Sequence, residues 1–134
     1  MNYSSTDILD TLSFFDSWEE RYKYIIDLGK ELPIMDSALK TDQTIVHGCQ
    51  SKVWLAPTKD GDTFQFYADS DAFIVKGLLA VILAAFNGKS SQEITEFDIE
   101  EYLNQMQLMK HLSSTRGNGV RAVVERIKTY AASV

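Results

Sequence analysis

An almost uninterrupted apolar stretch over residues 72–86 constrains the fold of this chain most strongly. It reads AFIVKGLLAVILAAF, with Lys76 and Gly77 as its only interruptions. A helix that crosses a bilayer needs roughly 20 consecutive apolar residues, and this stretch is shorter and carries a charge. A helix that is apolar all round is instead buried among other elements. We therefore predict a central helix that forms the spine of a core, and we expect no membrane partner.

Composition sets the class of the protein and excludes some partners. The chain has 134 residues, of which 45% are hydrophobic and 24% charged, so we expect one globular domain over residues 1–134. Its net charge of -6, with no cluster of Lys or Arg, argues against a nucleic-acid partner, whose phosphates require a basic face. The first residues lack the pattern of an export signal, so we expect a cytoplasmic protein, where an unpaired cysteine suits the reducing conditions.

Strand signals gather in the middle of the chain. Residues 44–47, 52–58 and 63–68 are strand candidates, because they are rich in β-branched, aromatic or alternating apolar residues. Asp60-Gly61 lies between the last two, and this pair tolerates the positive φ values of a hairpin turn. The pattern predicts a small antiparallel sheet of three strands with one face covered by helices.

Helix signals flank the strands on both sides. Before them, Asp16 and Glu19 have the spacing of a capping box, and Gly29 and Pro33 are the expected stop signals of the helix that follows. After them come the central helix and a last helix with an apolar stripe over residues 120–131. Helices N-terminal and C-terminal to a run of strands, without alternation, indicate an α+β fold.

Cys49 is the single cysteine and the candidate for chemistry. It follows His47 and Gly48 at a break between two strand candidates, with Lys52 three residues later. A thiolate is favoured beside His, Lys or Arg, and a loop on a rigid scaffold can present such a group to a partner. A small buried apolar residue is the structural alternative, because free cysteine is often fully buried.

Metal binding and hydrolysis are two further hypotheses for the same residues, and the sequence favours them less. A structural zinc site takes four ligands, and the chain offers Cys49, His47 and His111 besides carboxylates, so we predict no metal site. A Cys-His hydrolase stays open, because nucleophile and base need to be adjacent only in space.

Four segments, taken together, carry a resemblance to a known family. They are residues 18–29 (WEERYKYIIDLG, followed by Leu32-Pro33), 48–54 (GCQSKVW), 69–78 (DSDAFIVKGL) and 111–119 (HLSSTRGNG). Their order and spacing over nearly the whole chain resemble those of the SufE family, which includes the related CsdE proteins. Gln50-Ser51 is more similar to SufE than to CsdE.

The resemblance implies a sulfur acceptor of iron–sulfur cluster assembly. Such a protein takes sulfane sulfur from a pyridoxal-phosphate cysteine desulfurase (SufS-like or CsdA-like), and raises its turnover. It holds the sulfur as a persulfide on Cys49 and passes it to a scaffold such as SufBCD. The chain would bind no cofactor itself and would be no enzyme alone.

The resemblance also implies which residues surround the thiol. Cys49 would be the acceptor, with His47, Gly48, Gln50 and Ser51 supporting its loop. Because the thiolate must attack the outer sulfur of a persulfide yet resist oxidation, we expect the loop to tuck the sulfur against apolar neighbours and to swing out on docking.

For four further residues in the matched segments we expect a role in the structure or in partner binding. Asp69 and Asp71 are first of all candidate helix caps, with partner contact as the alternative. Lys76 is expected to pack its stem and extend its charge to solvent. Arg116 is expected to form an ion pair with one of the two carboxylates or to lie near the cysteine loop.

One alternative function comes from a different class. The chain would then be a regulatory docking module for a desulfurase or another enzyme, with a cysteine that is merely structural.

Overall fold

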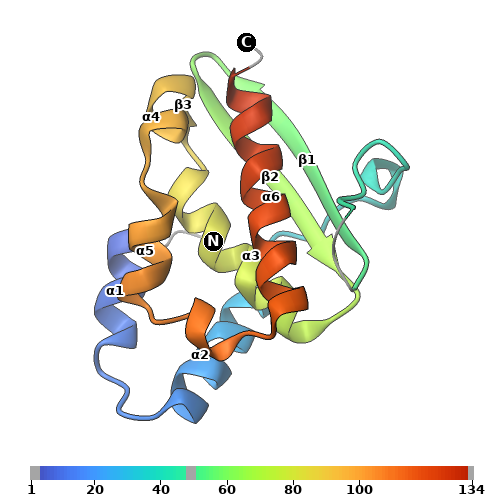
Figure 1. The fold of residues 1–134 in the computed structure, drawn as a ribbon. Coiled ribbons are helices and arrows are strands. Elements are labelled where there is room, and N and C mark those ends of the chain that lie inside the picture. The colour runs from blue at the N-terminus through green and yellow to red at the C-terminus, as the bar shows by residue number, and fades with distance from the viewer. Residues whose placement is uncertain (1–3, 48–50, 133–134) are drawn as a thin grey trace.

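The fold is α+β, as predicted, and the computed structural model describes residues 4–47 and 51–132 (Figure 1). In chain order the elements are α1 (Ser5–Leu12), α2 (Trp18–Lys30), the 3-10 turn η1 (Ser37–Leu39), β1 (Val53–Asp60), β2 (Thr63–Ser70), α3 (Phe73–Phe86), β3 (Lys89–Ser90), α4 (Ser91–Glu96), α5 (Ile99–Gln105), the 3-10 turn η2 (Met109–His111) and α6 (Ser114–Ala132). Helices therefore lie before and after the sheet in the sequence.

Helix α3 is the predicted spine of the core. Every residue from Gly77 to Phe86 is buried, and Ala80, Val81 and Phe86 are fully so. Figure 1 shows α3 in the middle of the molecule, with the sheet on one side and other helices on the remaining sides. In the part of the chain that the structure describes, no helix is long and apolar enough to cross a membrane.

Two glycines let α2 pack closely on α3. A Cβ on Gly77 would lie 2.3 Å from the carbonyl oxygen of Ile25, and one on Gly29 would lie 2.5 Å from the amide nitrogen of Gly77. Real Cβ atoms do not approach backbone this closely, so both positions require glycine. The expected role of Gly29 as a helix stop is wrong, because α2 continues through it to Lys30.

The sheet is a long hairpin with a short third strand. β1 pairs with β2 antiparallel from Val53 opposite Ser70 to Asp60 opposite Thr63, and Gly61 in the turn has the predicted positive φ, 61°. Phe64 and Phe66 of β2 are buried, whereas Gln65 between them is exposed. This alternation gives the sheet one covered face.

The third strand is not the predicted one. Residues 44–47 form only an isolated bridge, between Ile45 and Trp54, while β3 pairs with Thr63 and Phe64. The chain reaches β2 because α3 ends beside it: the Gly88 amide donates to the Phe64 carbonyl at 2.8 Å. The side-chain oxygen of Asn87 accepts from the Phe66 amide, also at 2.8 Å. The pairing of β3 therefore depends on a distant strand, and a segment of two residues is too short to show a strand pattern in the sequence.

The N-cap of α2 is Ser17, not Asp16. The Ser17 hydroxyl accepts from the Glu20 amide at 3.2 Å, so the cap lies one residue later than the sequence pattern indicated. Two adjacent residues that both favour caps produce this ambiguity.

Replacing Gly77 by alanine tests the close helix contact. The new methyl group would meet the backbone of Ile25, which cannot rotate away, so we expect the free energy of unfolding to fall by about 3 kcal/mol. Urea denaturation measures the change.

Gly117→Ala is the matched control for that substitution. Its Cβ would meet the flexible end of Met109 at 3.2 Å, and its backbone φ is not positive. We expect a change within about 1 kcal/mol of zero, because alanine also favours the helix. Equal effects of the two substitutions would contradict the packing account.

Candidate functional site

The chain that leads toward Cys49 is fixed to the edge of the sheet. The Val46 amide donates to the Val53 carbonyl at 2.8 Å, and the Leu55 amide donates to the Thr44 carbonyl at 2.9 Å. Val46 is buried. Residues 44–46, called here the entry stem, therefore hold a defined position on β1.

The chain that leaves the Cys49 segment is fixed at the end of the same hairpin. The Lys52 amide donates to Asp71 Oδ1 at 3.2 Å. The Lys52 carbonyl accepts from Ser70 Oγ at 2.7 Å and from the Asp71 amide at 3.3 Å. Residues 51–53, called here the exit stem, are thus tied to the junction between β2 and α3.

Cys49, Gly48 and Gln50 lie outside the described residues, as does the predicted tuck and swing of the loop. Their roles stay predictions. Of the other expected supports, His47 is exposed at the end of the entry stem, and Ser51 is half-buried in the exit stem. The structure therefore places both flanks of the thiol segment side by side on the sheet.

The two aspartates do not cap α3. The N-cap residue is Ala72, without a side-chain cap within the described chain, while Asp71 accepts from Lys52 and Asp69 lies at the end of β2. Their sequence position suggested a cap because Asp often precedes helices. Here the carboxylates instead tie the hairpin to its surroundings.

Asp69 forms the centre of a small charge cluster. Its carboxylate lies 2.6 Å from Lys40 Nζ and 3.5 Å from Lys76 Nζ, and it accepts from the Ser70 amide at 2.8 Å. Lys40 Nζ also lies 5.0 Å from the centre of the Trp54 ring. Lys76 therefore ends in an ion pair, in addition to the solvent contact that the sequence predicts.

The environment of Asp69 favours its charged form. Burial alone would raise the pKa of the carboxyl group. The Lys40 and Ser70 donors and the nearby Lys76 charge outweigh burial and hold the pKa below its ordinary value of 3.8. Asp69 is thus a carboxylate over the whole neutral range.

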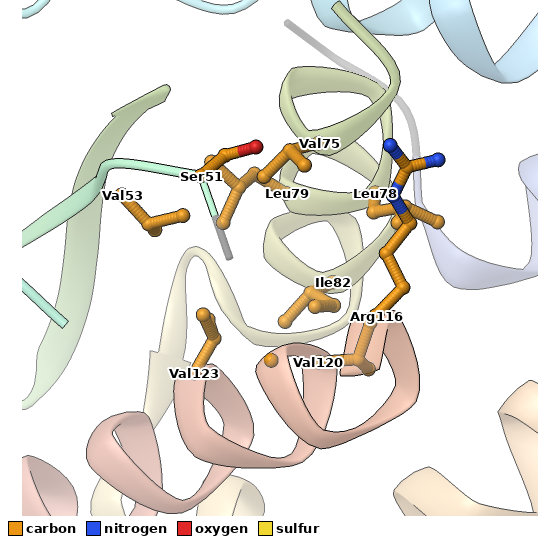
Figure 2. Close-up of a pocket in the computed structure, with 10 residues that line it drawn as sticks. Ser51, Val53, Val75, Leu78, Leu79, Ile82, Arg116, Val120 and Val123 are labelled. Atoms are coloured by element: carbon orange, nitrogen blue, oxygen red, sulfur yellow. The ribbon is translucent and has the colours of Figure 1, made fainter. Parts of the chain in front are cut away.

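An apolar cavity lies beside Ser51, between α3 and α6 (Figure 2). Its volume is about 30 Å³, which is more than the roughly 10–15 Å³ that a cavity needs to hold one water molecule. Aliphatic side chains of the exit stem, α3 and α6 line most of it: Val53, Val75, Leu78, Leu79, Ile82, Val120 and Val123. Ser51, Gly119 and Arg116 complete the lining.

Arg116 lies at this cavity and not at the aspartates. Figure 2 shows its side chain extending from the start of α6 along one side of the cavity, with Ser51 and Val53 on another. Among the described residues it forms no ion pair with Asp69 or Asp71, whose partners are those given above. Arg116 thus shares a cavity with Ser51, and its predicted place near the cysteine loop itself stays a prediction.

Three residues that hold the site had no recognisable signal in the sequence. Ser70, Lys40 and Arg126 each bind a stem or an element next to it, through partners 18 to 83 residues away along the chain. Because these partners are not separated by a short, regular spacing, one sequence alone does not show which residues contact each other. The described residues contain no group of three His, Cys, Asp or Glu side chains that could bind a metal.

The fold and the site together define a small α+β protein in which two anchored stems flank a one-cysteine segment and an apolar cavity lies beside Ser51 of the exit stem. Residues 6–131 match the family model SufE, the Fe-S metabolism associated domain. The chain therefore belongs to the SufE family, as its sequence segments indicated.

Relatives of similar length support this membership. The chain is 44% identical to an uncharacterized SufE-like protein of Rhizobium meliloti strain 1021, over 96% of this chain and 94% of that protein. It is 42% identical to an uncharacterized SufE-like protein of Rhizobium etli, over 96% of this chain and 89% of the relative.

A solved structure supports the fold. A hypothetical protein from Thermus thermophilus, determined in solution, superposes with a TM-score of 0.79 over 96% of this chain and 93% of that one. The two sequences are 17% identical, so this likeness concerns the fold alone.

Asp69→Asn tests the charge cluster at the exit stem. The amide keeps the shape but loses the charge, so we expect a loss of about 1–2 kcal/mol in the free energy of unfolding at pH 7. Because the pKa of Asp69 is lowered by folding, this stabilisation exists above the unfolded pKa and disappears as pH falls through the folded pKa. The difference between the two proteins should therefore begin to shrink as pH falls toward the unfolded pKa of about 4, and should vanish only below the folded pKa, which is lower.

Denaturant titrations at several pH values make this measurement. Asp27→Asn serves as the control, because Asp27 pairs with Lys30 on the surface, with side chains 56% and 66% exposed. An Asp69→Asn effect that does not change with pH would contradict the assigned role.

Proposed function

We propose that this protein accepts sulfur on Cys49 from a pyridoxal-phosphate cysteine desulfurase and passes it to an iron–sulfur cluster scaffold. The observation that carries the proposal is the anchored pair of stems around a single-cysteine segment, in a chain of the SufE family. The donor would be a SufS-like or CsdA-like enzyme and the recipient a SufBCD-like complex, both in the cytoplasm.

The proposed transfer needs no oxidant and no cofactor of this chain. The Cys49 thiolate attacks the outer sulfur of the donor's cysteine persulfide. A new S–S bond forms to Cys49 as the bond to the donor cysteine breaks, and the donor leaves as a thiolate. Removing the sulfur in this way regenerates the donor and explains why an acceptor would raise its turnover.

The cavity beside Ser51 suits a sulfur that must wait between two transfers. Its aliphatic lining excludes polar reactants, and its space is of the order of one extra atom. A persulfide sheltered there would be less open to oxidation than one in water. This shelter supports a carrier that moves between a donor and a recipient.

The charges at the rim suit the ionised thiol that transfer requires. Lys52 follows the segment in the exit stem, and Arg116 lies at the edge of the cavity. Cations near a thiol favour the thiolate. The site thus combines apolar shelter with nearby positive charge.

Sulfur acceptance is tested by incubating the protein with a desulfurase and cysteine and measuring intact mass. We expect the mass of at least one sulfur atom to be added, faster desulfurase turnover, and loss of both effects in Cys49→Ser. A Cys49→Ser protein that stimulates turnover fully would contradict the proposal and identify a docking module with a structural cysteine.

Arg116→Met tests the positive rim of the cavity. The substitution keeps an unbranched apolar side chain but removes the guanidinium group and its charge. We expect the rate of sulfur acceptance to fall roughly three- to tenfold, because fewer thiols are ionised at neutral pH. Single-turnover mass spectrometry measures the rate.

The same charge can be removed elsewhere on α6 as a control. Arg121 is exposed one turn further along the helix, and Arg121→Met should accept sulfur at the wild-type rate. Similar losses in both proteins would mean that overall charge, and not the rim, sets the rate.

A further inference from the structure

Arg126 of α6 binds the entry stem from the side opposite β1. Its Nη1 donates to the Ile45 carbonyl at 3.1 Å, and its Nη2 donates to the Gln43 carbonyl. Its Nε donates to the hydroxyl of Tyr130 at 3.2 Å, and the guanidinium carbon lies 5.5 Å from the centre of the Tyr130 ring. All three guanidinium nitrogens thus have partners, and the group is half-buried.

The backbone around the entry stem explains why one arginine reaches both carbonyls. The Thr44 carbonyl and the Val46 amide bond to β1. In an extended segment the carbonyl of the residue between them, Ile45, points the other way. Gln43 lies in the turn just before the stem, and the planar fork of an arginine spans the carbonyls of Gln43 and Ile45. Lysine has one donor centre and does not match this pair.

The Arg126 side chain with these hydrogen bonds is called here the Arg126 clamp. It binds the edge of the entry stem that faces away from β1. Without it two carbonyls would lose a charged donor, and only the bonds to β1 and those within the turn at residues 39–45 would hold the entry stem. Segments held by few bonds at an edge open locally more often than the rest of a protein. Ile45 lies only four residues before Cys49 in the sequence.

We propose that Arg126 is a positioning residue for sulfur acceptance, because it fixes the entry stem from which the Cys49 segment begins. This inference rests on the proposed function and assigns part of it to a residue distant in sequence. The proposed action runs through the backbone of Gln43 and Ile45, to which Arg126 donates.

A test without any desulfurase measures how fast iodoacetamide alkylates Cys49 in the isolated protein. Arg126→Met keeps an unbranched apolar side chain but removes all donors, so we expect alkylation to be roughly three- to tenfold faster. Arg126→Lys should be intermediate, and Arg121→Met should match wild type. All four proteins are compared well below their melting temperatures, so that global unfolding does not contribute.

A second test measures transfer from a desulfurase at increasing acceptor concentration. We expect Arg126→Met to lower the maximal stimulated rate severalfold and to leave the half-saturating concentration unchanged, because the clamp acts on the thiol segment and not on docking. If Arg126 only stabilised the fold, its substitution would lower the melting temperature without lowering the maximal rate at an unchanged half-saturating concentration.

The outcomes separate the inference from the function on which it rests. Alkylation of Arg126→Met within twofold of wild type would overturn the positioning role, even if wild type accepts sulfur normally. A change in the half-saturating concentration alone would also overturn it. A third outcome is faster alkylation of Arg126→Met together with a wild-type protein that accepts no sulfur from the desulfurase. It would support the effect of Arg126 on the cysteine segment and overturn the proposed function.

Discussion

The close contact between α2 and α3 at Gly29 and Gly77 fixes the element around which the rest of the protein is arranged. Because the backbones approach without side chains between them, α2 packs closely along one face of α3. The remaining faces of α3 are then free for the hairpin and α6, and the cavity lies where these elements meet. The site therefore depends on a contact made on another side of the same helix.

The stems around the cysteine segment are held by bonds between distant parts of the chain. β1 and Arg126 of α6 hold the entry stem, and the junction between β2 and α3 holds the exit stem. Such an arrangement gives the short segment between the stems a defined base. A carrier that meets two different partners benefits from such a base, because it does not have to be rebuilt at each encounter.

The fold was predictable wherever a single segment carried its own signal. The apolar run at 72–86 predicted α3, and Asp60-Gly61 predicted the hairpin turn, because burial on all sides and positive φ each demand particular residues. Predictions failed where a tertiary partner decided the outcome. Gly29 serves a helix contact and not a stop, and Asp69 binds lysines and not a helix end.

The site was predictable only in part, for the same reason. The segment resemblance indicated the SufE family and hence Cys49, whose role stays a prediction, and it included Ser51 and Arg116, which the structure brings to one cavity. Lys40 and Arg126 could not be found, since their partners lie 29 and 81 or more residues away. No periodicity or spacing in one sequence links residues so far apart.

The most direct measurement follows labelled sulfur from cysteine to a defined peptide. A desulfurase charged with ³⁵S-cysteine is mixed with this protein for a single turnover, and the products are digested with trypsin without reductant. The account predicts that label appears in the peptide of residues 41–52, which contains Cys49, and that a reductant releases it. Label that stays on the desulfurase, or that appears in any other peptide of this chain, would contradict it.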